Sequence, residues 1–260
     1  MLGPSRKPTT TQTGGTMDLK GSTAIVTGAS AGIGRATAIA LAEVGVDIAI
    51  TARTAEALEE TAAAAREHGV RVLATPGDVT DRDHVRDFVA ATLAEFGKID
   101  ILVNNAALHT RQRSLVEIGT ERWDRVVAVN FTAPFDFARQ VVPAMREAGG
   151  GVVINVCSDA ATIPDRTYSG AAYGASKAAL AAFTQSIRCE EWTHGIRATA
   201  IFPGETDTAM IGLRPDGTSD ERRTVLQKPE DIAAAVVFAA GMPARANVSE
   251  IVVQSTVQRT

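Results

Sequence analysis

The sequence is poor in cysteine, in clustered histidine, in long apolar runs and in excess positive charge. Its only cysteines, Cys157 and Cys189, argue against a disulfide framework. Its four histidines are scattered without the spacing of metal ligands, so we expect no metal site. No apolar run is long enough to span a bilayer. The formal net charge of −4 gives no reason to expect a nucleic-acid or membrane partner.

The first residues of the chain also lack an apolar stretch. Residues 1–16 are rich in Thr, Pro and Gly, so they do not resemble a secretory signal. We therefore expect a disordered leader, a folded part that begins near Met17, and a cytoplasmic protein. The length of 260 residues suffices for one large α/β domain, and we expect residues 17–260 to form it.

The chain does contain a regular alternation of two kinds of segment. Short, nearly continuous apolar runs are typical of strands in a parallel sheet covered on both faces, and they alternate with amphipathic, alanine-rich runs typical of helices. The predicted strands are Thr23–Thr27, Asp47–Thr51, Arg71–Ala74, Ile99–Val103, Gly151–Val156, Arg197–Phe202 and Glu250–Val253. The predicted helices are Ile33–Val44, Ala55–Glu67, Asp83–Glu95, Glu121–Met145, Ala171–Thr193 and Pro229–Ala240. This alternation predicts an α/β fold, a Rossmann-type doubly wound parallel sheet of about seven strands with helices on both faces.

A glycine-rich turn joins the first predicted strand to the first predicted helix. The tract Thr27-Gly28-Ala29-Ser30-Ala31-Gly32-Ile33-Gly34 contains three glycines. Glycine lets the backbone approach a pyrophosphate closely, and a helix N-terminus supplies N–H donors and positive potential. The order of strand, turn and helix therefore predicts a dinucleotide site rather than a plain turn.

The residues after the second predicted strand indicate which dinucleotide is bound. An acidic residue there would bind the ribose 2′-hydroxyl of NAD, whereas an arginine accommodates the 2′-phosphate of NADP. This chain has Ala52 and Arg53, and no carboxylate before Glu56. We predict NADP(H) as the cofactor, with NAD(H) less favoured; the alternative is that Arg53 simply faces water.

Tyr173 and Lys177 stand four residues apart in a helix pattern, which places a phenol and an ammonium on one face, one turn apart. A phenol is a poor acid–base group at neutral pH until a nearby cation favours its ionised form. Taken alone, such a pair is more often a solvated helix face than a catalytic pair.

Further motifs accompany this pair in a characteristic order. The chain carries Thr27-Gly28-x-x-x-Gly32-x-Gly34, Asp78-Val79, Asn104-Asn105-Ala106, Asn130, Ser158, Tyr173-x-x-x-Lys177 and Pro203-Gly204. On these motifs it resembles the short-chain dehydrogenase/reductase family, in its compact single-domain branch, from about Asp18 to Gly241. It departs from the family pattern at Ala107, where glycine is usual. Its tail is similar to that of the subgroup acting on small 3-hydroxy acids, including serine-type dehydrogenases.

The resemblance implies roles for individual residues. Tyr173 would be the acid–base residue, and Lys177 would lower its pKa and bind the nicotinamide ribose. Ser158 would polarise the substrate carbonyl, and Asn130 would complete a proton relay through a water. Asp78 would contact the adenine and Asn104 the adenosine side of the cofactor. The full set of implied cofactor contacts is Gly28, Ser30, Gly32, Ile33, Gly34, Arg53, Asp78, Val79, Asn104, Ala106, Tyr173, Lys177, Pro203, Gly204, Thr206 and Thr208.

The activity implied is hydride transfer between NAD(P)(H) and a secondary alcohol or the matching ketone or aldehyde, with NADP(H) preferred. One alternative is a catalytically silent dinucleotide-binding regulatory protein. Others are a 3-oxoacyl-carrier ketoreductase, and an epimerase or dehydratase of the wider family. The resemblance also implies a homo-dimer or homo-tetramer.

Substrate recognition is expected in three variable segments, residues 109–115, 159–170 and 206–227. They carry the arginines Arg111, Arg113, Arg166, Arg214, Arg222 and Arg223. Most of them are expected to be solvated loop charges, and the alternative is that they bind an anionic substrate group such as a carboxylate. The substrate loops near residues 205–228 are also predicted to form a lid.

Pro134 stands four residues after Asn130. A proline inside a helix cannot bond the carbonyl four residues earlier. We hypothesise that Pro134 leaves the Asn130 carbonyl able to hold the relay water, and a tolerated kink is the alternative.

Overall fold

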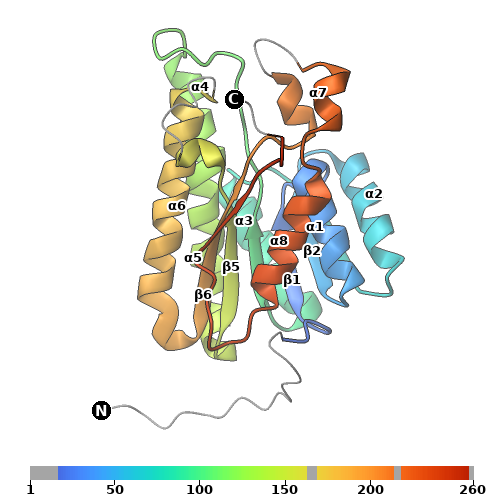
Figure 1. The fold of residues 1–260 in the computed structure, drawn as a ribbon. Helices are drawn as coiled ribbons and strands as arrows, with labels where there is room; N and C mark the ends of the chain where they lie inside the picture. Colours follow the sequence, from blue (N-terminus) through green and yellow to red (C-terminus); the bar gives the residue numbers. More distant parts are fainter. Residues whose placement is uncertain (1–16, 163–168, 214–217, 258–260) are drawn as a thin grey trace.

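The computed structural model describes residues 17–162, 169–213 and 218–257. The predicted leader at residues 1–16 lies outside these described residues, as do Arg166 and Arg214. The described chain forms one sheet with helices on either side of it (Figure 1).

The sheet has seven strands in the order β3-β2-β1-β4-β5-β6-β7, and every neighbouring pair is parallel. The strands are β1 (Thr23–Thr27), β2 (Asp47–Ala52), β3 (Val72–Pro76), β4 (Ile101–Asn104), β5 (Gly151–Val156), β6 (Ile196–Pro203) and β7 (Glu250–Val253). The seven predicted strands are confirmed, with ends shifted by at most two residues. The strand order reverses between β1 and β4, which is where ligands bind in sheets of this kind.

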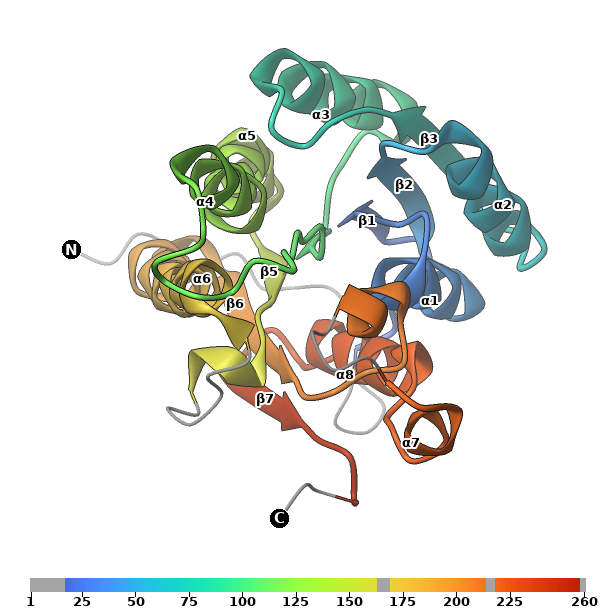
Figure 2. The same cartoon turned by 90° about the horizontal axis from the view of Figure 1, so that it is seen from above.

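The helices cover both faces of the sheet, as predicted (Figure 2). One side carries α1 (Gly32–Glu43), α2 (Ala55–Arg66) and α8 (Pro229–Ala240). The other side carries α3 (Arg82–Phe96), α4 (Thr120–Val127), α5 (Ala133–Ala148) and α6 (Ala171–Glu191). The shorter segments include the 3₁₀ turns η2 (Asp159–Ala161), η4 (Trp192–His194) and η5 (Ala209–Leu213), and the helix α7 (Asp220–Thr224).

Each face of the sheet carries an apolar core, because successive side chains of a strand point to opposite faces. Val26 and Ile48 pack toward α1 and α8, whereas their neighbours Ile25 and Ala49 pack toward α3 and α5. All four side chains are fully buried. Burial on both faces explains why the strands appear in the sequence as continuous apolar runs.

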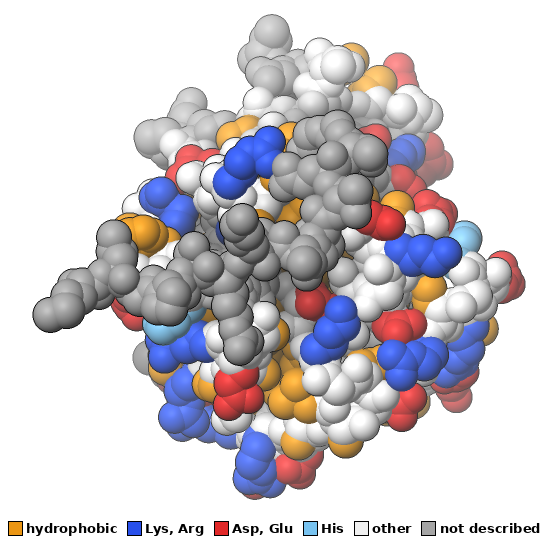
Figure 3. Space-filling view, turned by 90° about the horizontal axis from the view of Figure 1, so that it is seen from below, with side chains coloured by type: hydrophobic (Ala, Val, Ile, Leu, Met, Phe, Trp, Pro, Cys, Tyr) orange, Lys and Arg blue, Asp and Glu red, His pale blue; other side chains and the backbone are white. Residues whose placement is uncertain are grey.

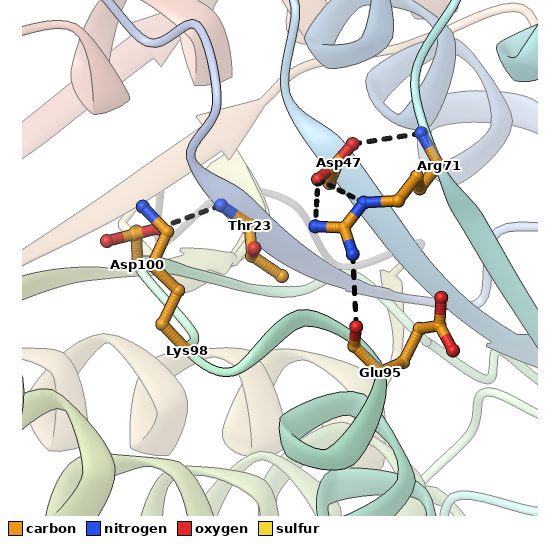
Figure 4. Close-up of polar contacts among 6 residues, drawn as sticks. All are labelled: Thr23, Asp47, Arg71, Glu95, Lys98 and Asp100. Carbon is orange, nitrogen blue, oxygen red and sulfur yellow. Dashed lines mark hydrogen bonds and ion pairs between the residues drawn. The ribbon is translucent and has the colours of Figure 1, made fainter.

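Polar contacts fix the amino ends of the strands (Figure 4). Arg71 donates from Nε and Nη2 to Asp47 Oδ2, at 2.9 and 2.6 Å, and from Nη1 to the Glu95 carbonyl at 3.0 Å. Asp100 accepts from the backbone N–H of Thr23 at 2.8 Å. These bonds join the beginnings of neighbouring strands. Figure 3 shows the molecule from the side of these amino ends, where acidic and basic side chains are interspersed in the visible part of the surface.

The single helix predicted for Glu121–Met145 is wrong in detail, because it is broken into three segments. Between α4 and α5 lies a π-helical segment, η1 (Ala128–Thr132), in which the Ala133 N–H bonds the Ala128 carbonyl five residues earlier. Pro134 follows at once and has no N–H to continue the regular ladder. Wide turns of this kind are frequent at functional sites, and Asn130 lies within this one.

Candidate active site

A cleft of about 380 Å³ opens at the carboxyl ends of the strands, over the place where the strand order reverses. It is lined by residues from the loops after the first six strands, on the face seen in Figure 2. Most of the predicted site residues meet there: Gly28, Ser30, Gly32, Ile33, Arg53, Asp78, Val79, Ala106, Ser158, Tyr173, Lys177, Pro203, Gly204, Thr206 and Thr208.

In the turn between β1 and α1, the first position has room only for glycine. Gly28 has a φ of +67°, and a Cβ added there would lie 2.8 Å from Ala106 Cα. No side chain caps the N-terminus of α1, and its first turn contains no acidic residue. Its backbone N–H groups and positive dipole end are therefore available to an anion at the cleft. This cradle suits the pyrophosphate of a dinucleotide.

Gly34 does not line the cleft, although it was predicted to contact the cofactor. A Cβ on Gly34 would lie 2.3 Å from the Gly28 carbonyl oxygen and 2.4 Å from Asn105 Nδ2. Its role is therefore close packing of α1 against the turn. Ala107, the departure from the family pattern, lines the cleft and causes no backbone strain, since no described residue other than glycine has a positive φ.

Asn104 does not face the cleft either, and the predicted contact with the adenosine side is not supported. Its side chain is 2% exposed and donates to Asn155 Oδ1 at 2.9 Å, inside the sheet. The next residue, Asn105, lines the cleft and donates from Nδ2 to the carbonyl of Thr27 at 2.9 Å. Asn105 thereby supports the glycine-rich turn from the neighbouring strand.

Ser158, Tyr173 and Lys177 come together in the cleft from β5 and α6. Ser158 lies close enough to Tyr173 to affect the pKa of the phenol, and its Oγ accepts from the Ala160 N–H at 3.2 Å and donates to Asp159 Oδ1 at 3.5 Å. Lys177 is 1% exposed, and its Nζ donates to the Val156 carbonyl at 2.7 Å and lies 5.9 Å from the centre of the Tyr173 ring. The spacing predicted from the helix period is therefore realised, with the serine as a third polar group.

The pKa values of the pair are set mainly by burial. Burial raises the pKa of Tyr173 to about 12, and the nearby Ser158 hydroxyl only partly opposes this. Burial likewise lowers the pKa of Lys177 to about 8. Burial therefore outweighs the lowering of the Tyr173 pKa that the resemblance implied, and Lys177 Nζ donates to the Val156 carbonyl.

Asn130 is fully buried and does not line the cleft. Its Oδ1 accepts from the Leu108 N–H at 2.7 Å, and its Nδ2 donates to the Leu108 carbonyl at 3.0 Å and to Ser176 Oγ at 3.1 Å. The side chain thus joins the loop after β4 to α6, next to Tyr173. The predicted role of Asn130 in a proton relay would therefore fall to its backbone carbonyl, and it stays a prediction.

Two cleft residues had no role assigned from the sequence. His109 stacks on the Tyr173 ring, with centroids 4.3 Å apart and planes 11° apart. Arg125 pairs with Asp78. Neither contact has a local sequence signal, because His109 lies in a loop and Arg125 is 47 residues from its partner.

The arginines of the substrate segments differ in their surroundings. Arg222 pairs with Glu205 and Arg223 with Asp207, at 2.5 and 2.7 Å. These two charges are neutralised within the loops that carry them. Among the described arginines of these segments, only Arg113 lines the cleft, and its charge acts on Tyr173.

Comparison with known proteins identifies the family. A family model described as short chain dehydrogenase matches residues 22–217. The chain is 34% identical over 233 residues to the short chain dehydrogenase/reductase astE of Aspergillus oryzae, with 85% of this chain and 88% of that protein covered. It is 36% identical over 222 residues to the cis-4-hydroxycyclohexanecarboxylate dehydrogenase of Sinomonas cyclohexanicum, with 84% and 88% covered.

Solved structures agree with the sequence matches. The crystal structure of a metagenomic short-chain oxidoreductase in complex with NADP superposes with a TM-score of 0.79 at 32% identity, covering 93% of this chain and 100% of that one. In the described part of the chain, no helix combines the length and the apolar character needed to cross a membrane. The chain belongs to the short-chain dehydrogenase/reductase family of oxidoreductases.

Proposed function

We propose that the protein interconverts a secondary alcohol and the corresponding ketone or aldehyde, with NADP(H) as its cofactor and Tyr173 as acid–base residue. The observation that carries this proposal is the meeting of Tyr173, Ser158 and buried Lys177 beside the glycine-rich cradle. When bound, the nicotinamide supplies or accepts the hydride.

The side chains account for the proton and for the developing charge. At neutral pH the Tyr173 phenol carries its proton, since burial holds its pKa at about 12, so it can donate to a substrate oxygen during reduction. Ser158, which lines the cleft near Tyr173, offers a second donor to the same oxygen. Two donors held in place and directed at one oxygen stabilise the negative charge that develops there. In the oxidative direction, the phenolate oxygen would take the alcohol proton.

Turnover of a panel of ketones, aldehydes and alcohols, followed by NADPH absorbance, tests the activity. Tyr173→Phe should lower kcat at least about a hundredfold, because it removes the proton donor, while leaving the Kd for NADPH nearly unchanged. Wild-type turnover with an equally active Tyr173→Phe variant would refute the mechanism. Cofactor binding without turnover across the panel would favour the silent regulatory protein instead.

The preference for NADP(H) rests on Arg53. This residue is exposed at the edge of the cleft after β2, next to Ala52 and Thr54. No acidic residue from this loop lines the cleft to repel a 2′-phosphate. The NADP complex of the metagenomic relative supports the same choice.

Comparing kcat/KM for NADPH and NADH tests the preference. Arg53→Gln should raise the KM for NADPH about tenfold, the value of a lost charged hydrogen bond, and leave the KM for NADH unchanged. A wild-type preference for NADH, or an equal loss with both cofactors, would contradict this role.

For the substrate we propose a hydroxy acid or its keto acid, with its carboxylate directed toward Arg113. The position of Arg113 near Tyr173 and the activity named for the Sinomonas relative support this class, whereas the cleft carboxylates of Asp159 and Glu205 oppose it. Equal kcat/KM for a keto acid, its ester and a neutral ketone would discard this substrate class.

A further inference from the structure

Arg125 connects two walls of the cleft. It lies on α4 and lines the cleft together with Asp78, which belongs to the loop after β3. Its Nη2 donates to Asp78 Oδ2, and its Nη1 donates to Thr80 Oγ1 at 2.5 Å. Val129, one turn further along, also lines the cleft, so this helix face is directed at the site.

Thr80 completes a closed set of hydrogen bonds around the carboxylate. Its backbone N–H and its Oγ1 both donate to Asp78 Oδ1, at 2.9 and 2.8 Å. Oδ1 therefore has two donors, and Oδ2 has one, from Arg125. Since a carboxylate oxygen accepts about two hydrogen bonds, Oδ2 has room for one further donor.

The Asp78 carboxylate is kept ionised, so it can only accept hydrogen bonds. Burial raises the pKa of Asp78, but the Thr80 N–H and Arg125 outweigh it and bring the pKa to about 2. The side chains of Arg125 and Asp78 are 36% and 34% exposed, so both border the cleft. A fixed, ionised acceptor matches the exocyclic amino group of adenine and repels the carbonyl that hypoxanthine has at the same position.

We propose that Arg125 is a positioning residue that orients the Asp78 carboxylate toward the adenine amino group and so sets the base specificity of the cofactor cleft. This inference rests on the proposed dinucleotide-dependent activity. It extends the adenine contact implied for Asp78, because it assigns the selection of the base to an arginine on a different element.

The test compares adenine and hypoxanthine forms of the reduced cofactor. Kd values for NADPH and its hypoxanthine analogue are measured by nicotinamide fluorescence for wild type, Arg125→Gln and Arg125→Lys. NADH and its analogue are measured in parallel, which makes the result independent of Arg53. The matched control is Arg82→Gln, which breaks the 3.1 Å pair with Asp136 outside the cleft lining. Circular dichroism verifies that each variant is folded.

Wild type should bind the adenine form about tenfold more tightly, the value of one hydrogen bond to a charged group. Arg125→Gln should bring that ratio close to one, Arg125→Lys should restore part of it, and the control should keep it. A double variant, Asp78→Asn with Arg125→Gln, should have the same ratio of adenine to hypoxanthine binding as Arg125→Gln alone, because both substitutions act through one contact.

An unchanged ratio in Arg125→Gln, or an equal weakening of both base forms, would overturn the role of Arg125 and leave the proposed function intact. A wild-type protein that binds none of the four dinucleotides would overturn the proposed function as well. The two failures are therefore distinguishable.

Discussion

At the scale of single residues, burial makes the Tyr173 phenol a weaker acid than tyrosine in water. The same burial makes Lys177 a weaker base. The flat stack of His109 on the Tyr173 ring restricts its orientation, and the side-chain bonds of Asn130 hold the loop that carries His109. The site is thus oriented before substrate arrives, which is a requirement for efficient proton transfer.

The raised pKa gives a spectroscopic prediction. Because the neutral phenol is favoured, Tyr173 should stay protonated at pH 10, the ordinary value for tyrosine, and ionise only toward its pKa of about 12. The ultraviolet difference between wild type and Tyr173→Phe should therefore contain no phenolate signal below pH 10 in the cofactor-free protein. Half-titration below that pH would mean that Lys177 acidifies the phenol even without cofactor.

At the scale of elements, the turn between β1 and α1 and the break between α4 and α5 both shape the cleft. In the turn, Gly28 and Gly34 bring backbones together more closely than any side chain allows. In the break, the π-helical segment η1 precedes Pro134, so that the wide turn and the missing N–H occur together. The cofactor cradle and the position of Asn130 thus depend on local backbone geometry.

Gly34→Ala tests the close approach. Its Cβ would lie 2.3 Å from the Gly28 carbonyl oxygen, a backbone atom that cannot move without shifting the turn. We expect a loss of about 1–3 kcal/mol in the free energy of unfolding, as for overpacked sites, with weaker NADPH binding.

Gly119→Ala is the matched control, because φ is −70° there and a Cβ would meet no atom within 4 Å. Denaturant titration of both variants gives the comparison. If Gly34→Ala were as stable as Gly119→Ala, the turn would be less tightly packed than its geometry indicates.

At the scale of the whole molecule, apolar side chains remain exposed on the outer helices. Phe135 on α5 is 42% exposed and Phe238 on α8 is 51% exposed. Exposed aromatic residues on structured faces are frequent at interfaces between subunits. The homo-dimer or homo-tetramer implied by the family resemblance stays a prediction, and these two faces are its candidates.

Sedimentation velocity at micromolar concentration should give the mass of a dimer or a tetramer. Phe135→Glu should shift the distribution toward smaller species, because a charge would be buried in the contact. Val116→Ser, which changes a 91% exposed residue in the loop before α4, should have no effect. A monomeric wild-type protein would contradict the prediction.

The sequence by itself determined the strands, most of the helices, the glycine-rich turn and the pairing of Tyr173 with Lys177. These features depend on periodicity, on residue type at a turn, or on spacing within one helix, all of which are local. The lack of an acidic residue directly after β2 is likewise a property of the sequence alone.

Only the tertiary structure decided which side chains at the ends of these elements face the cleft. The structure turns Asn104 into the sheet and Asn105 toward the turn, and it brings Arg125 to Asp78. It also shows that Lys177 bonds a backbone carbonyl and that burial dominates the pKa of Tyr173. Such contacts join residues far apart in the chain, and the packing of neighbouring elements fixes them, which no local pattern encodes.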